Sequence, residues 1–461
     1  MSVIKGSTGT VVAPRSTGIT VIGGKSESER GLLLAAEERE SRFRLLAGTA
    51  ILLMLFTAAF GLAWDIRWHV VVGRDTFFTP PHMLLYGGIA IAGLVSLGVV
   101  LADTWRYYTG APAVNDRTTT RVLGVFHAPL GFVVAGFGLL TLLLAAPLDN
   151  YWHELYGIDV ALWTPFHMMG MVGGFIAGLG VVYIFASEAA RARSQGRYRF
   201  RLWGLTGTEW GVLVAMAMLV GHLMVAAMPA SNQFPTTLIG PLELLTYPLL
   251  LALFLPAIGV ASVVVTRRPG AATLVFAVFF LRQVAFSIMV PWAVWWLIGG
   301  DVSQLRVPGW RPGVNPVELM FTALLVGLPM LVIDLAAAYV CRRKQARLQT
   351  PAHAQAQAQA QAQAHSEQEE RNGTGPGWLL TVGWACAAGT ASAVPLLIIA
   401  SVAVTALIAG ARQLALPASI IIGNVPHAQA ALEAVPATLV AGALSALTGL
   451  GWGSFLRVYD R

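Results

Sequence analysis

Two stretches of the chain place aspartate and histidine at the same spacing. The residues are Asp65, His69 and His82 in the first stretch, and Asp149, His153 and His167 in the second. The aspartate and the first histidine of each set are four residues apart, so they share one face of a helix. The second histidine follows proline, which suits the first turn of the next helix. A short connection would return that helix beside the first, so one carboxylate and two imidazoles would converge.

One carboxylate and two imidazoles make a metal-binding set. Two histidines and one carboxylate with open positions suit non-haem Fe(II), and imidazole also suits copper and zinc. The alternative is an aromatic belt at a membrane interface with hydrogen-bonded polar ends, because tryptophan precedes the first histidine of each set. One set alone would leave both interpretations open, whereas two sets in register favour metal.

An internal duplication explains the repeated spacing. Seven identities occur in matching order, offset by 84 or 85 residues: Asp65, Trp68, His69, Gly73, Asp75, Pro80 and His82 against Asp149, Trp152, His153, Gly157, Asp159, Pro165 and His167. We expect Asp75 and Asp159 either to accept hydrogen bonds from imidazole N–H groups, which would fix the tautomer, or to be plain loop residues.

The composition places these sets in a membrane protein. Only 53 of 461 residues are charged (30 Lys and Arg plus 23 Asp and Glu), or 11%, and 56% are apolar; a soluble domain has roughly 25% charged residues. The fold class is therefore an all-α polytopic membrane protein, and its partner is the lipid bilayer. Soluble enzymes and nucleic-acid-binding domains are excluded, and Cys341 and Cys386 support neither a disulfide framework nor a cysteine metal site.

About ten apolar segments are long enough to cross a bilayer, which needs about 20 residues. They lie near 45–64, 82–101, 122–147, 165–186, 208–229, 241–265, 271–297, 316–340, 378–410 and 434–456. Most basic residues fall in alternate connections, so the positive-inside rule predicts five hairpins with outward tips. Both termini would then be cytoplasmic, with the metal sites on the outer side of the plasma membrane.

Changes in composition divide the chain into five parts. Residues 1–40 are a polar tail that we expect to be cytoplasmic and disordered, and 41–190 are the duplicated four-helix unit. A second four-helix unit covers 191–341. An Ala-Gln repeat makes 342–377 a flexible linker, and 378–461 form a C-terminal helical hairpin.

Two glutamates are weaker site candidates. Glu243 and Glu318 each stand two residues after proline at the predicted start of an apolar helix, in the place that His82 and His167 take in their hairpins. They could line the same outer surface in a metal or proton role. Alternatively, a carboxylate near a helix N-terminus is stabilised by the helix dipole. His222, within the fifth span, is expected to be a helix-packing residue.

At the duplicated residues the sequence resembles the C subunit of the copper membrane monooxygenases, the particulate methane and ammonia monooxygenase family. Trp68–His69, Arg74–Thr76 and Phe78–His82 carry the resemblance, which covers roughly residues 45–190. The family's Asp-x3-His-x12-His copper motif matches Asp65, His69 and His82. Its second motif, Asn-x3-His-x13-His, matches the second set except that Asp149 replaces asparagine.

The resemblance implies copper at both sets and O2-dependent hydroxylation of a small apolar substrate, with Asp65, His69 and His82 as the catalytic centre. In the family this subunit works beside others, one of which carries a soluble copper domain that this chain lacks, so partner subunits are expected to supply it. Two alternatives stay open: a copper transporter or copper-handling protein without catalysis, and a relic in which metal only braces the hairpins.

Overall fold

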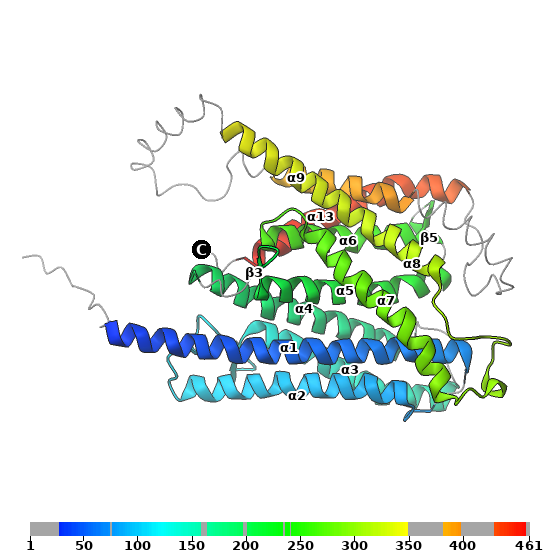
Figure 1. Cartoon of the computed structure of the whole chain (residues 1–461), viewed down its shortest axis with the longest axis horizontal. Helices are drawn as coiled ribbons and strands as arrows, with labels where there is room; N and C mark the ends of the chain where they lie inside the picture. The colour runs from blue at the N-terminus through cyan, green and yellow to red at the C-terminus, as the bar shows by residue number, and fades with distance from the viewer. Residues whose placement is uncertain are drawn as a thin grey trace, which may run out of the picture.

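The chain folds as a bundle of long helices with almost no sheet (Figure 1). The computed structural model describes residues 27–73, 76–157, 164–196, 201–233, 236–239, 241–348, 381–397 and 428–457. Within these residues nine helices are long and apolar enough to cross a membrane. The predicted class, an all-α polytopic membrane protein, is confirmed.

Most of the predicted spans appear as single helices. The helices are α1 (Glu27–Val71), α2 (Pro80–Tyr108), α3 (Leu130–Tyr156), α4 (Pro165–Ser194), α5 (Gly207–Gln233), α6 (Thr246–Thr266), α7 (Ala271–Leu297), α8 (Pro316–Thr322), α9 (Leu328–Leu348) and α13 (Ala428–Phe455). A π-helical turn, η2 (Ala323–Gly327), joins α8 to α9, so the eighth span is continuous but irregular. Of the predicted span 378–410, only the shorter apolar helix Thr381–Leu397 lies within the described residues.

Three short antiparallel hairpins, which the sequence did not predict, connect helices. They pair β1 (Thr120–Val122) with β2 (Phe126–Ala128), β3 (Arg201–Leu202) with β4 (Leu205–Thr206), and β5 (Thr236–Ile239) with β6 (Leu242–Leu245). Tight turns with positive φ close the first two, at Leu123–Gly124 and Trp203–Gly204. These strands are too short to show alternation in the sequence.

Helix α1 extends beyond the predicted span into the predicted tail. It begins at Glu27, so residues 27–40 are helical. Their alanine, leucine, glutamate and arginine are strong helix formers. Ion pairs one turn apart support this part, with 2.6 Å between Glu38 and Arg42 and 3.2 Å between Glu40 and Arg44. The rest of the predicted tail lies outside the described residues.

Glycine lets the two helices of each duplicated hairpin approach closely. A Cβ atom at Gly61 of α1 would lie 2.6 Å from the backbone nitrogen of Leu85 in α2, and one at Gly88 would lie 2.7 Å from the carbonyl oxygen of Met54. In the second hairpin, Gly173 of α4 meets the backbone of α3 at Gly138 in the same way. Small residues at such interfaces are typical of membrane helix pairs.

The segment between α7 and α9 returns across the end of α1. Figure 1 shows α7 running obliquely across the bundle toward that end. Trp64, Trp68 and Val71 of α1 are buried against Phe286 and Val290 of α7. Beyond α7, the backbone N–H of Arg306 donates to the carbonyl of Val71 at 2.8 Å. The first duplicated hairpin is thus held by a distant part of the chain.

At the opposite end, α1 and α2 are joined by buried ion pairs. The Arg44 guanidinium lies 2.7 Å from the Asp103 carboxylate, and these side chains are 2% and 0% exposed. Arg106 pairs with Glu40 at 3.0 Å and with Asp103 at 3.2 Å. Two cations and two anions therefore neutralise one another inside the bundle.

The C-terminal helix packs on the body of the bundle. Gly449 of α13 lies against the backbone of Ala257 in α6, and Gly453 lies against Val264. Helix α9 continues to Leu348, so the first residues of the predicted linker 342–377 are helical, and 349–380 lie outside the described residues.

Candidate metal centres

The helix boundaries place each histidine where the spacing predicted. Asp65 and His69 lie in the last two turns of α1, and His82 is the third residue of α2, after Pro80 and Pro81. Asp149 and His153 lie near the end of α3 in the same way. His167 is the third residue of α4, where its backbone N–H donates to the side chain of Thr164, the residue that caps the helix. Each set therefore joins the end of one helix to the start of the next.

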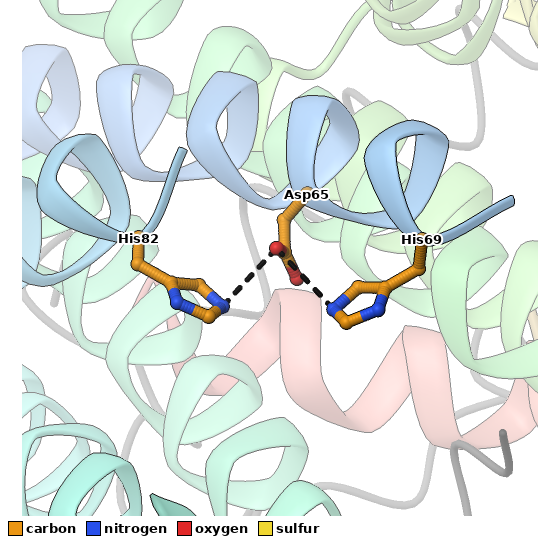
Figure 2. Close-up of side chains that lie close together, drawn as sticks. All are labelled: Asp65, His69 and His82. Atoms are coloured by element: carbon orange, nitrogen blue, oxygen red, sulfur yellow. Dashed lines mark ion pairs between the residues drawn. The ribbon is translucent and has the colours of Figure 1, made fainter. Parts of the chain in front are cut away.

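The first set converges on a single carboxylate oxygen. Oδ1 of Asp65 lies 3.1 Å from Nε2 of His82 and 3.6 Å from Nε2 of His69. Figure 2 shows the carboxylate between the two imidazole rings, which approach it from α1 and α2. Asp65 and His82 are 14% and 12% exposed, whereas His69 is 32% exposed, so the set is open on the His69 side.

The second set has the same construction. Oδ2 of Asp149 lies 3.2 Å from Nε2 of His153 and 3.2 Å from Nε2 of His167. In both sets one ligand atom from each of the three residues lies within 4.8 Å of the others. The duplicated sequence pattern is therefore a duplicated three-dimensional site.

Backbone carbonyl groups orient two of the imidazoles. Nδ1 of His82 lies 3.1 Å from the carbonyl oxygen of Thr76, and Nδ1 of His153 lies 3.2 Å from that of Gly157. Because a carbonyl only accepts, Nδ1 carries the proton and Nε2 presents its lone pair to the centre. This is the role expected of Asp75 and Asp159, which lie outside the described residues.

The geometry fits a metal ion better than a hydrogen-bonded cluster. Oδ1 of Asp65 is buried and accepts no hydrogen bond from the described residues. Nε2 of His82 is only 3.1 Å from this oxygen, and it is therefore not aligned to donate to it. In the second set Oδ2 of Asp149 faces the histidines, and the other oxygen, Oδ1, is buried without a donor among the described residues. Ligand atoms about 2.0–2.2 Å from one ion lie roughly 3–3.6 Å from each other. The distances from the carboxylate oxygen to the imidazole nitrogens, 3.1–3.6 Å in the two sets, fall in this range.

Aromatic rings line the His82 side of the first set. The His82 ring stacks on Tyr86 with 5.3 Å between ring centroids, and Tyr86 stacks on Phe77 at 5.1 Å. Phe78, next to Phe77, is 75% exposed. An apolar face therefore adjoins the imidazole at the start of α2.

The weaker candidates lie elsewhere. The prediction that Glu243 starts a helix is wrong: it lies in β6, paired with Leu238, and α6 begins at Thr246. Glu318 does lie in the first turn of α8, which Asn315 caps. Its carboxylate is 3.9 Å from the guanidinium of Arg67, so it lies beside α1 but outside the Asp-His set.

His222 packs between helices, as expected. Its Nε2 donates to the carbonyl of Met171 at 2.7 Å, and its ring lies against Gly174 of α4. The ring thus links α5 to α4 one turn below His167. Among the described residues, no further group of three metal-ligating side chains accompanies the two sets.

The sequence does not predict that the α7–α8 connection packs beside the end of α1, next to the first site. Arg306 lies against Gly73, four residues after His69, and Trp310 packs in the apolar cluster around Trp64 and Trp68. The concentration of tryptophan and arginine in 295–311 was the available signal. It did not reveal which hairpin this segment would pack beside.

Comparison of the chain with protein-family models, with curated proteins and with solved structures gives no match. Function is therefore inferred from the two sites and from the spacing of their ligands.

Replacing Gly61 with alanine should disrupt the first site selectively. The new Cβ would lie 2.6 Å from the nitrogen of Leu85 and 2.8 Å from the carbonyl of Pro81, so α2 must move where it presents His82. Overpacking of this kind costs about 1–3 kcal/mol. Metal titration should show weaker binding at the first site and unchanged binding at the second. Gly87→Ala is the control, because its Cβ would meet nothing within 4 Å; equal loss in both variants would contradict the prediction.

Proposed function

We propose that this chain is a copper-binding membrane subunit of an oxygen-activating hydroxylase that acts on a small apolar substrate. Asp65, His69 and His82 would hold copper at the catalytic centre, and Asp149, His153 and His167 would hold a second copper ion. The observation that carries the proposal is the pair of matching sets, each with two imidazole Nε2 atoms 3.1–3.6 Å from one carboxylate oxygen.

Copper is favoured over iron and zinc for two reasons. Both spacings match the copper motifs of the monooxygenase C subunit that the sequence resembles. In addition, copper binds nitrogen and oxygen ligands most tightly among the divalent first-row metals. Iron and zinc remain the alternatives that metal analysis would identify.

The membrane placement is also part of the proposal. Basic residues gather at the ends of the helices opposite the two sets, as with Arg106 at the end of α2 and Arg191 and Arg193 at the end of α4. By the positive-inside rule this end faces the cytoplasm. Both termini would then be cytoplasmic, and the metal centres would lie at the outer face of the plasma membrane.

When bound, copper supplies the electron-transfer chemistry that activates O2. The residues of the chain hold and orient it. Thr76 keeps the His82 proton on Nδ1, the Asp65 carboxylate balances charge, and the open side at His69 leaves room for oxygen. The Phe77 and Tyr86 rings beside His82 form an apolar wall that excludes water and can receive a substrate from the lipid.

A labelling experiment tests this function. Hydroxylation consumes the substrate, O2, two electrons from an added donor and two protons, and it yields the alcohol and water. In native membranes supplied with a short-chain alkane, a two-electron donor and 18O2, we expect labelled alcohol that is lost in His82→Ala. His127→Ala, at the opposite end, is the control. A His82→Ala chain that binds no metal at the first site yet forms alcohol at the wild-type rate would contradict the proposal.

The packing beneath the sites disfavours the transport alternative. A permeating ion needs polar groups deeper in the bundle. Below Asp65, α1 and α2 meet backbone to backbone at Gly61 and Gly88, and below Asp149 the close contact is at Gly138 and Gly173. These contacts leave no space within either hairpin for a hydrated ion. Metal-dependent flux into vesicles without oxygen consumption would favour transport instead.

A further inference from the structure

The two metal centres have matching ligands but different charged surroundings. Within the first stretch, 64–88, Arg67 and Arg74 offset Asp65 and Asp75. Within the second, 148–174, the acidic residues are Asp149, Glu154 and Asp159, and there is no lysine or arginine. The duplication has therefore kept the ligands while the charges beside them diverged.

The α7–α8 connection increases this difference. It brings Arg306 to the end of α1, where the Arg306 side chain lies against Gly73 and its N–H donates to Val71. Arg311 in the same connection lies over the Trp295 ring, with 5.2 Å from guanidinium to ring centroid. The segment thus adds cations on the side of the first site.

Two acidic residues in the same region, Glu318 and Asp301, have ionic or hydrogen-bonding partners. Glu318 lies 3.9 Å from Arg67. Asp301 accepts hydrogen bonds from Ser303 and Gln304, which hold the pKa of its carboxyl below the usual value. Arg67 already offsets Asp65, so Asp301 and Glu318 balance the two further arginines, Arg306 and Arg311.

Among the described residues, no lysine or arginine forms an ion pair with Asp149 or Glu154 of the second site, and Arg282 of α7 lies against Gly221 of α5, deeper in the bundle. Glu154, next to His153, accepts a hydrogen bond from the amide of Asn150 at 3.0 Å. The second site therefore lies among uncompensated acidic residues, whereas the charges around the first site, which include nearby arginines, are close to balanced.

We infer that the second site is the tighter site for divalent ions, and that the first site, with Arg306 beside it, more readily holds a monovalent ion such as Cu(I). The inference rests on the proposed metal-binding function and assigns ions of different charge to the two sites. A negative surrounding stabilises the ion of higher charge, whereas nearby guanidinium groups penalise it. The first site is thus the better suited of the two to change oxidation state.

Two chains with one site each allow the comparison. His153→Ala/His167→Ala leaves only the first site, and His69→Ala/His82→Ala leaves only the second. Full-length chains in nanodiscs would be titrated with Co²⁺, read by its visible absorption, and with Cu(I) in competition with a chelator. We expect the second-site chain to bind Co²⁺ about three- to tenfold more tightly, the scale of one or two partly screened charges. The order should reverse or level for Cu(I).

Charge-removing variants separate this effect from ordinary differences in structure. Adding Arg306→Gln to the first-site chain should tighten Co²⁺ binding, and adding Glu154→Gln to the second-site chain should weaken it. Arg42→Gln, on exposed helix at the opposite end, should change neither. High salt should reduce the difference.

Each outcome is decisive. Equal Co²⁺ affinities, or a difference that neither Arg306→Gln nor Glu154→Gln changes, would overturn the inference and leave the proposed metal sites in place. Binding of Co²⁺ and Cu(I) by neither chain would overturn the proposed function, and the inference with it.

Discussion

Replacement of Asp65 with alanine is expected to remove metal from the first site and leave the second site loaded. Its Oδ1 atom is the point on which both imidazoles converge, at 3.1 and 3.6 Å, so the two histidines lose their common partner. Loss of a group that only supports a ligand typically costs 10–100-fold in metal affinity. Loss of the ligand itself should cost at least that much.

The second site supplies the internal control for this variant. Asp149→Ala should give the mirror result, and the double variant should bind no metal at either site. Equilibrium dialysis with metal quantification would measure both affinities. An Asp65→Ala chain that keeps wild-type affinity at the first site would show that the carboxylate is not a ligand. Asp116→Ala, at an exposed aspartate that accepts from Tyr107, should be neutral.

Replacement of Asp103 with alanine is expected to cause the largest loss of stability. Asp103 is fully buried and lies 2.7 Å from the Arg44 guanidinium, which is 2% exposed. Without Asp103, Arg44 and Arg106 would share only Glu40, leaving a buried charge uncompensated. Breaking a buried ion pair from one side costs about 3–5 kcal/mol. Thermal unfolding in nanodiscs should show a clear fall in the transition temperature.

Two further variants make the stability prediction specific. Arg42→Ala removes an exposed pair with Glu38 and should change stability by less than about 0.5 kcal/mol. Arg44→Met/Asp103→Leu removes both partners and should recover much of the loss, because no charge is left unpaired. If Asp103→Ala were as stable as Arg42→Ala, the buried network would not hold α1 to α2.

The sites were predictable from sequence because they depend on local spacing. Asp65 and His69 lie one helical turn apart, and Pro80 begins the helix that carries His82. These relations hold whatever the rest of the fold does. The hairpin brought the two ends together because glycine at 61 and 88 lets the helices pack closely.

The parts that the sequence did not reveal depend on distant contacts. The sequence of α1 does not show that Arg306, more than 200 residues later, would lie beside Gly73. Pro241 before an apolar run predicts that Glu243 starts a helix, but backbone pairing with Leu238 holds it in a strand. The charge of residues 27–40 predicts a tail, whereas these residues are helical and have pairs such as Glu38 with Arg42 one turn apart.

Counting copper in the purified full-length chain shows whether the two Asp-His-His sites hold this metal. Inductively coupled plasma mass spectrometry combined with EPR should find close to two copper ions per chain, about one in His69→Ala/His82→Ala, and none when His153→Ala/His167→Ala is added. A correctly folded chain that retains all six ligands and takes up no copper, even from a copper-supplemented buffer, would contradict copper binding at these sites.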